Sequence, residues 1–178
     1  MEHPLLMTTA PRPVDTSTGS ITVMIGIPGA GKSHFLKGEF EAGRMDNILS
    51  LDEARGEFGV GPHDQSVTPQ AVDHVVEQAG ILLDAGAAVT IDATSTTVSD
   101  RRTWLDLARA HDVPARAVIV RIPLKVALYR NSVRQYPVPT EFVCECHHRV
   151  TNLTDGALLA EGFAAVSELN TQFRGGQA

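Results

Sequence analysis

Cysteine and long apolar runs are both scarce in this chain, and each scarcity excludes a class of protein. The two cysteines, Cys144 and Cys146, stand two positions apart, a spacing that rarely permits a disulfide. We therefore expect free thiols and a reducing, cytoplasmic location. No apolar run reaches the ~18 residues of a membrane span, so we expect no membrane partner. The first eleven residues contain no lysine or arginine, which argues against a secretory signal.

Positive charge is scarce over one long segment and concentrated in the next. Residues 45–100 carry ten acidic side chains and one basic side chain, Arg55, whereas residues 101–134 carry eight basic and two acidic side chains. The net charge of −6 argues against a general nucleic-acid coat protein. The basic segment is compatible with local binding of a polyanion and equally with an ordinary solvated surface.

Apolar stretches with the length of strands alternate with helical stretches along the chain. The strand-like runs cover residues 21–27, 47–51, 87–92, 117–122 and 164–169, and the helical stretches cover residues 32–42, 70–85, 99–111, 124–134 and 140–153. Such alternation is typical of an α/β fold in which helices cover both faces of a parallel sheet. We expect one domain over residues 20–173, preceded by a flexible leader (1–19) and followed by a disordered tail (174–178).

A phosphate-binding loop (P-loop) follows the first of these strands. Residues 26–33 read Gly-Ile-Pro-Gly-Ala-Gly-Lys-Ser, and they connect a strand-like run to a helical stretch. The glycines let backbone N–H groups curl around phosphate oxygens at the positive end of the helix. Lys32 adds a charge for the β- and γ-phosphates, and Ser33 can ligate Mg²⁺. We therefore predict a P-loop domain that binds ATP, or another NTP, with Mg²⁺.

Two aspartates follow predicted strands. Asp92 closes the apolar run 88–91, and Asp52 closes the run 48–51. Ligands of such sheets bind at the carboxyl ends of the strands. One aspartate can therefore support a hydrated Mg²⁺, and the other can accept a proton from an attacking hydroxyl. Each aspartate could also serve only as a helix N-cap.

The lone arginine of the acidic segment stands close to one of these aspartates. Arg55 follows Asp52 by three residues, so the two side chains can share one side of a helical turn. An arginine beside a candidate base suits an anionic acceptor such as a phosphate. A surface salt bridge with Glu53 or Glu57 is the alternative, and it would contribute little stability.

Two further arginines stand four positions apart in a predicted helix. Arg130 and Arg134 would then project from one face, where an anion such as a transferred phosphoryl group would stabilise both. A solvated helix face is the alternative. Pro137 and Pro139 make the following stretch a loop that could act as a lid.

Cysteine and histidine are close together in residues 144–148, which read Cys-Glu-Cys-His-His. On a helix, Cys144 and Cys146 point in opposite directions, and only Cys144 shares a face with His147 or His148. A structural zinc site needs four convergent ligands, so we do not expect one here.

Taken together, the motifs resemble the kinase module of polynucleotide 5′-hydroxyl kinases, as found in bacterial end-healing enzymes and phage kinases. The resemblance extends over residues 21–169. It is carried by the blocks at residues 26–33, 50–56 (Ser-Leu-Asp-Glu-Ala-Arg-Gly), 64–68 (Asp-Gln-Ser-Val-Thr), 89–94 (Val-Thr-Ile-Asp-Ala-Thr), 130–134 (Arg-Asn-Ser-Val-Arg) and 138–139 (Val-Pro). It implies an adenylate-kinase-like, five-stranded parallel sheet with a helical lid, in which the strand ending in Asp92 lies beside the P-loop strand and the strand ending in Asp52 lies farther out.

The resemblance also implies roles for individual residues. Asp52 would be the general base, and Arg55 would hold the phosphate on the 3′ side of the acceptor nucleotide. The transferred phosphoryl group would be contacted by Lys32, Arg130 and Arg134. Mg²⁺ would be held by Ser33 directly and by Asp92 through water. The nucleotide would be contacted by Gly26, Pro28, Gly29, Ala30, Gly31, Lys32, Ser33, His34, Arg130 and Arg134.

The chain departs from the family pattern at two positions. Ser95 stands where asparagine is usual and His34 where threonine is common, which leaves the choice of nucleotide and acceptor open. No phosphatase or ligase motif is present, so we expect a kinase alone that acts on the 5′-hydroxyl of RNA or DNA. Two alternatives remain: a kinase for a small molecule such as an antibiotic, sugar or nucleotide, and a non-catalytic NTP-binding module. Homo-oligomerisation is left open.

Overall fold

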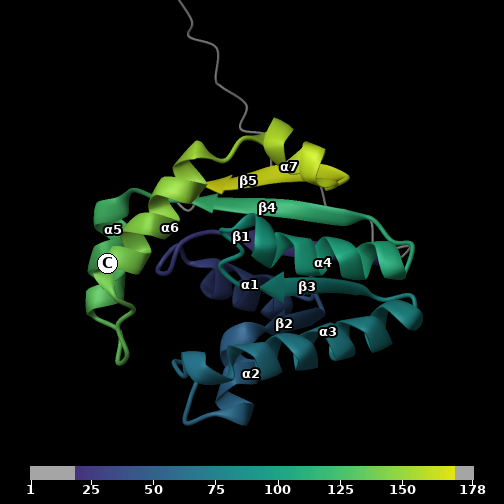
Figure 1. The fold of residues 1–178 in the computed structure, drawn as a ribbon, viewed down its shortest axis with the longest axis horizontal. Helices are drawn as coiled ribbons and strands as arrows, with labels where there is room; N and C mark the ends of the chain where they lie inside the picture. Colours follow the sequence, from purple (N-terminus) through teal and green to yellow (C-terminus); the bar gives the residue numbers. More distant parts are fainter. Residues whose placement is uncertain (1–18, 171–178) are drawn as a thin grey trace, which may run out of the picture.

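Five parallel strands form one sheet, and their order in the sheet is β2-β3-β1-β4-β5 (Figure 1). The computed structural model describes residues 19–170. The strands are β1 (Ser20–Ile25), β2 (Asn47–Ser50), β3 (Ala88–Asp92), β4 (Ala115–Arg121) and β5 (Ala165–Asn170). The predicted leader, apart from Gly19, and the predicted tail lie outside the described residues. The predicted strand ending in Asp92 does lie beside β1, with β2 one place farther out.

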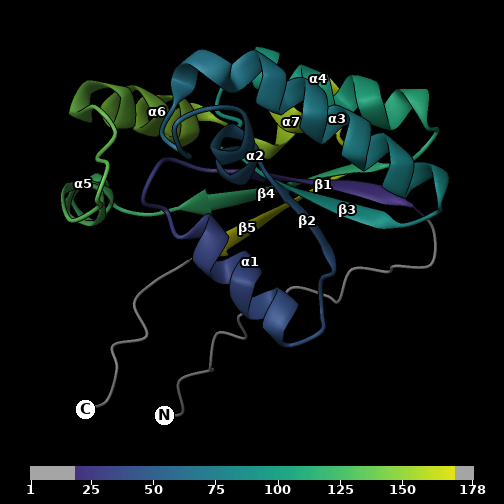
Figure 2. The ribbon, with the colours of Figure 1, turned by 90° about the horizontal axis from the view of Figure 1, so that it is seen from below.

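Helices cover both faces of the sheet, as predicted. Figure 2 shows α1 on one face, and α3, α4 and α7 on the other. The helices are α1 (Lys32–Glu41), α2 (Leu51–Phe58), α3 (Thr68–Asp84), α4 (Val98–Ala110), α5 (Leu124–Ser132), α6 (Thr140–Asn152) and α7 (Asp155–Glu161), with a short 3₁₀ helix, η1 (Gln65–Val67). No helix in the described part of the chain combines the length and the apolar character that crossing a membrane requires.

The core lies on the sheet and is densest around its middle strand. All six residues of β1 are buried, because β3 and β4 flank it and helices lie on both of its faces. Ile21, Val23 and Ile25 share one face of β1 and are completely buried, as are Ile91 of β3 and Ile119 of β4. Burial on both faces explains why these strands read as continuous apolar runs in the sequence.

The second strand ends one residue earlier than predicted, and this moves Asp52 from the end of a strand into a helix. Leu51 was expected to close the strand, but it is the first residue of α2. The Ser50 side chain accepts a hydrogen bond from the backbone N–H of Glu53 and so caps the helix. Asp52 therefore lies in the first turn of α2, and the N-cap is Ser50 instead.

The fifth helix is also shorter than predicted, so Arg130 and Arg134 do not project from one helix face. Helix α5 ends at Ser132, and Arg134 follows it. The Asn131 amide exchanges two hydrogen bonds with the backbone of Val138, of 2.7 and 3.0 Å, which folds the chain back after the helix. We call the segment 133–139 closed by this contact the lid loop.

Helices α2 and α7 were not among the predicted helical stretches, although a helical turn after Asp52 was. Both are short, with eight and seven residues. Helix α7 is defined mainly by its ends: Thr154 caps its N-terminus by accepting from Ala157 N–H, and Gly162 ends it at a φ of 119°. Such short helices have too few turns for a clear apolar period.

Candidate active site

The P-loop wraps the start of α1 at the carboxyl end of β1. Gly29 and Gly31 adopt φ values of 81° and 91°, which side-chain-bearing residues rarely adopt. A Cβ on Gly29 would lie only 2.8 Å from the carbonyl oxygen of Ala127, so the loop needs glycine there for space as well. Gly31 caps α1 without any side-chain hydrogen bond to the helix N–H groups. The first turn of α1 thus has backbone donors suited to phosphate oxygens.

Lys32 is folded back over this loop. Its side-chain amine donates to the carbonyl oxygens of Gly26 at 2.9 Å and Ile27 at 3.4 Å, and the residue is only 8 % exposed. Burial lowers the pKa of Lys32, and the carboxylates of Asp92 and Asp52 partly offset this. The lysine is therefore a buried cation held within the field of two acidic groups.

Asp92 and Ser33 face each other beside Lys32. Asp92 is the last residue of β3, is 8 % exposed, and has the Ser33 side chain near enough to favour its ionised form. Burial raises the pKa of Asp92, and the contacts with Ser33 and Lys32 lower it in part. One hydroxyl and one carboxylate suit Mg²⁺, which keeps several waters and takes its other ligands from phosphates. The pair fits the metal that the sequence implied.

Asp52 acts on the same groups from the first turn of α2. Its carboxylate acts electrostatically on both Lys32 and Asp92, so the three groups lie close together although they come from different elements. Arg55 pairs with Asp52 by donating Nη2–H to Oδ1, and it also donates Nε–H to the carbonyl oxygen of Pro62 at 3.1 Å. The alternative, a surface salt bridge of Arg55 to Glu53 or Glu57, is therefore not the one that forms.

The Asp52–Arg55 pair joins a buried group to an exposed one. The Arg55 side chain is 11 % exposed and the Asp52 side chain 57 %. A nearly buried guanidinium thus orients a carboxylate that solvent, or a substrate, can reach.

The two arginines of the 130s approach the P-loop separately. Arg130 donates to the carbonyl oxygen of Gly29 at 3.2 Å, and its Nη1 would lie 3.4 Å from a Cβ on Gly31. Arg134 is exposed, and its charge is among those that lower the pKa of Lys32. Of the other predicted nucleotide contacts, Pro28 and Ala30 are buried in the loop and His34 is exposed on the first turn of α1.

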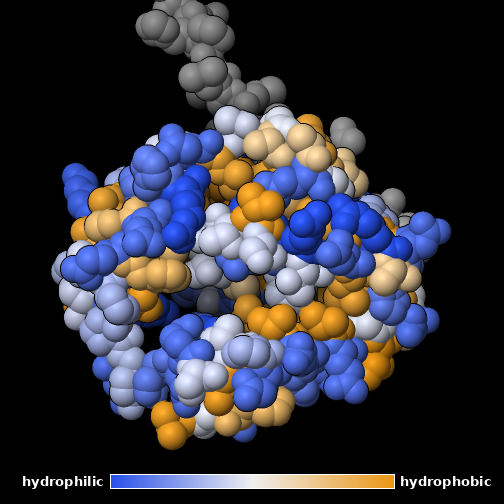
Figure 3. Space-filling model, in the orientation of Figure 1, coloured by the Kyte–Doolittle hydropathy of each residue, from blue (hydrophilic) through white to orange (hydrophobic). Residues whose placement is uncertain are grey.

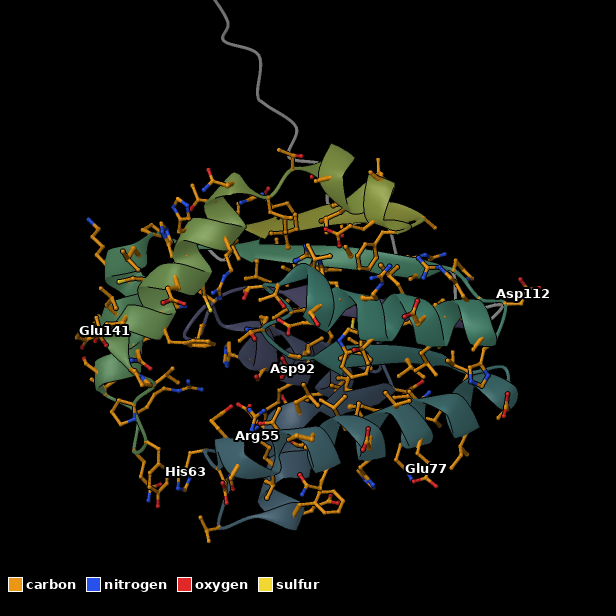
Figure 4. The ribbon with its side chains drawn as sticks, in the orientation of Figure 1. Arg55, His63, Glu77, Asp92, Asp112 and Glu141 are labelled. Carbon is orange, nitrogen blue, oxygen red and sulfur yellow. The ribbon has the colours of Figure 1, made fainter. Side chains whose placement is uncertain are left out.

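A hollow lies beside these groups. Figure 3 shows the surface depressed between the side that α5 and α6 form and the side that α2 forms. Figure 4 shows Asp92, Arg55 and His63 in that order from the end of β3 to the loop after α2, along this hollow. A cavity of about 300 Å³ adjoins Arg55, and its lining is rich in hydroxyl groups: Thr68, Thr94, Ser95, Thr96, Thr97, Ser99 and Thr103.

The loop after β3 is anchored by a buried ion pair that sequence reasoning missed. Arg101 of α4 is 2 % exposed and donates two hydrogen bonds to Glu161 of α7, of 2.7 and 2.6 Å, and one to the carbonyl oxygen of Ser95 at 3.1 Å. The neighbouring Thr94 carbonyl accepts from Gly26 N–H at 3.0 Å. The P-loop is therefore tied through this loop to α4 and α7.

Ser95 has an unusual backbone for a serine. Its φ is 45°, and its buried hydroxyl finds no hydrogen-bond partner among the described residues. Asparagine, usual at this position in the resembling family, tolerates that conformation better than serine. The departure noted in the sequence thus coincides with a strained position beside the site.

The cysteine and histidine segment lies in α6. Cys146 is buried, and the Thr96 hydroxyl donates to its Sγ at 3.6 Å, so this sulfur packs against the loop after β3. Within residues 19–170 no three His, Cys, Asp or Glu side chains converge as metal ligands would.

A comparison with protein families matches residues 21–152 to the family AAA_33, described as an AAA domain. Among solved structures, a chain of the Pnkp1/Rnl/Hen1 RNA repair complex has a TM-score of 0.64 at 18 % identity, over 75 % of this chain and 44 % of that one. A second structure of a Pnkp1/Rnl/Hen1 complex gives a TM-score of 0.56 at 20 % identity, over 70 % and 43 %.

A third solved structure is similar over most of both chains. It is a protein from Chloroflexus aurantiacus provisionally described as a kinase, with a TM-score of 0.61 at 14 % identity, over 88 % of this chain and 87 % of that one. At such identities the likeness shows the shared fold. The chain spans less than half of the length of the two RNA repair chains that it matches.

Proposed function

Because the chain belongs to the AAA_33 family and has a kinase-like P-loop domain, we propose that it transfers the γ-phosphate of ATP to the 5′-hydroxyl of an RNA or DNA end. The family and the fold support a P-loop domain of the phosphotransferase kind that binds a nucleotide. The acceptor and the roles of individual residues are the proposal.

One observation carries it: Asp52 and Arg55 form an ion pair, and the Asp52 carboxylate acts electrostatically on Lys32 of the P-loop. A nucleotide-binding module needs Lys32 and the loop but has no use for an accessible carboxylate within the field of Lys32 and Asp92. A kinase needs such a carboxylate to accept the proton of the attacking hydroxyl. Arg55, which orients Asp52, gives the same site a cation for an anionic acceptor.

The donor side would be held by charges that converge on the transferred group. Lys32 and the first-turn N–H groups of α1 would bind the β- and γ-phosphates, and Arg130 and Arg134 would stabilise the charge that spreads over the phosphoryl oxygens. Ser33 and Asp92 would hold Mg²⁺, which supplies charge neutralisation between the β- and γ-phosphates.

The acceptor side would begin at Asp52. The 5′-hydroxyl gives its proton to the Asp52 carboxylate as its oxygen attacks the γ-phosphorus, and ADP departs as the bond between the β,γ-bridging oxygen and that phosphorus breaks. Arg55 would bind the phosphate on the 3′ side of the same nucleotide. The hydroxyl-lined cavity beside Arg55 offers room and hydrogen-bonding groups for the nucleoside.

Two of the solved structures that share the fold come from larger assemblies. One of the similar chains belongs to the Pnkp1/Rnl/Hen1 RNA repair complex, and a second belongs to a Pnkp1/Rnl/Hen1 complex. They are more than twice as long as the matched segment.

The test is transfer of radiolabelled γ-phosphate from ATP to 5′-hydroxyl RNA and DNA oligonucleotides, run beside a panel of antibiotics, sugars and nucleosides. We expect labelled oligonucleotide that a phosphatase can strip and that does not form from acceptors already bearing a 5′-phosphate. Labelling of a small molecule alone would replace the proposal with a small-molecule kinase. Tight ATP binding without any transfer would leave only a binding module.

A further inference from the structure

Two exposed aromatic rings meet at the mouth of the hollow. His63 belongs to the loop between α2 and η1, and Tyr136 to the lid loop. Their ring centroids lie 3.9 Å apart with 12° between the planes, which is a face-to-face stack. His63 is exposed and Tyr136 is 53 % exposed. The contact therefore joins two sides of the hollow at the surface and adds nothing to the core.

The loop that carries His63 is already ordered by local hydrogen bonds. The Asp64 carboxylate accepts from the N–H groups of Val60 and Ser66 and from the Ser66 hydroxyl. A Cβ on Gly61 would lie 2.9 Å from Cε1 of His63, so the imidazole packs closely over that glycine. The position of the His63 ring is thus set within its own loop, before any ligand is present.

The ring pair lies next to Arg55, which is proposed to bind the acceptor phosphate, both along the chain and in space. Arg55 donates to the carbonyl oxygen of Pro62, the residue directly before His63. Figure 4 shows Asp92, Arg55 and His63 following one another along the hollow. A strand whose 5′-hydroxyl meets Asp52 and whose first phosphate meets Arg55 would reach the rings with its next nucleotide.

We propose that Tyr136, backed by His63, is a stacking platform for the nucleobase of the second nucleotide of the acceptor. This inference rests on the proposed function. Every base has an aromatic face, so such a platform binds single strands without selecting a sequence. A small acceptor without a second base gains nothing from it. Stacking on the platform would therefore add to the preference for oligonucleotides over nucleosides that the phosphate contact at Arg55 provides.

The experiment compares two acceptors that differ only in one base. Both are 5′-hydroxyl trinucleotides with the same phosphates, and one has an abasic second position. The ratio of their kcat/KM values isolates the contribution of that base, because the Asp52 and Arg55 contacts are common to both. We expect the native protein to favour the base-containing acceptor by on the order of tenfold, mostly through KM.

Variants assign this preference to the ring pair. Tyr136→Ala is expected to reduce the ratio to near one, whereas Tyr136→Phe keeps it, because stacking needs the ring and not the hydroxyl. Tyr129→Ala is the matched control, since Tyr129 of α5 is also exposed, at 70 %, and stacks on no other ring among the described residues. Thermal unfolding of each variant verifies that the fold is intact.

The possible results of this experiment distinguish failure of the stacking platform from failure of the proposed kinase activity. Transfer to both trinucleotides with no preference for the base overturns the platform and leaves the kinase. An equal loss for both acceptors in Tyr136→Ala also overturns it, because the ring pair then only fastens the lid loop. Transfer to neither trinucleotide overturns the proposed function and this inference together.

Discussion

Arg55 donates a hydrogen bond to the carboxylate of Asp52 from the next turn of the same helix, and it does so while almost completely buried. The pair links the two candidate groups on the acceptor side of the site. Its burial is unequal, so an incoming substrate meets the carboxylate first and the guanidinium behind it. A change at either residue should therefore affect the acceptor more than the donor.

Arg55→Ala should remove the preference for acceptors that carry a 3′-phosphate. A charge-assisted contact in a partly buried site is worth roughly 2–3 kcal/mol, so the native protein should prefer a nucleoside 3′-phosphate over the bare nucleoside by roughly 30- to 150-fold. The measurement is kcat/KM for both acceptors in both proteins. Arg102→Ala, at an exposed arginine of α4, is the control and should preserve the preference. Equal use of the two acceptors by the native protein would favour the small-molecule kinase.

Asp52→Asn should slow transfer far more than it weakens ATP binding. Asparagine keeps the size of the side chain and can still accept from Arg55, but it is a very poor proton acceptor. We expect a loss of about 10²- to 10⁴-fold in kcat, with the Kd for ATP nearly unchanged in a titration. A collapse of ATP affinity with normal transfer from bound ATP would instead assign Asp52 to the metal or to the fold.

Lys32→Met should abolish most turnover without unfolding the protein. Methionine preserves the aliphatic length but not the charge, and one well-aimed electrostatic contact is worth ~10²–10³ in rate. Burial lowers the pKa of Lys32, so loss of this charge removes a desolvation cost and should not lower the melting temperature. Activity assays and thermal unfolding together test the point, and a folded, fully active variant would contradict the P-loop assignment.

Asp92→Asn should stabilise the nucleotide-free protein at neutral pH while impairing transfer. Burial raises the pKa of Asp92 above its ordinary value of 3.8, so the folded state binds its proton more tightly than the unfolded state does. The free energy of unfolding of the native protein should then fall as the pH rises from 3.8 through the raised pKa. The variant should lack this contribution. Urea unfolding of both proteins at a series of pH values, without nucleotide, measures this contribution. If their unfolding free energies do not differ, Ser33 and Lys32 offset the cost of burying Asp92 completely and the prediction is wrong.

Glu161→Gln should destabilise the fold and loosen the P-loop. The change leaves the guanidinium of Arg101 buried without its countercharge, a defect that costs about 3 kcal/mol. Because Arg101 also holds the loop that bonds Gly26, the KM for ATP should rise as well. Glu145→Gln, which alters an exposed ion pair with Arg149, is the matched control and should cost under about 1 kcal/mol. Similar unfolding curves for the two variants would contradict a role for the buried pair.

The parts of the fold that local pattern determines were predictable, and the parts that depend on distant contacts were not. The P-loop and the buried strand before it were read from consecutive residues, and the five parallel strands and their coverage by helices are confirmed. The end of β2 was misplaced because Leu51 is apolar and continues the run, whereas the deciding group is the hydroxyl of Ser50.

The candidate site shows the same division. Lys32, Asp52 and Asp92 were proposed from motifs, and their roles remain predictions, although the fold brings the three groups together. Arg134 was assigned to a helix face because a four-residue spacing predicts one, yet the Asn131 amide turns the chain after Ser132. Arg101 and Glu161 are 60 positions apart, and no local signal connects them.

The link from Glu161 through Arg101 to the loop beside Gly26 also has a consequence for synthesis of the protein. The P-loop is synthesised well before Glu161, the last residue of α7, whose carboxylate anchors the loop that supports the P-loop. A nascent chain ending before residue 161 would hold the arginine without its partner. The nucleotide site should therefore become fully ordered only after α7 has been synthesised, and a stalled chain should bind ATP more tightly once α7 has left the exit tunnel.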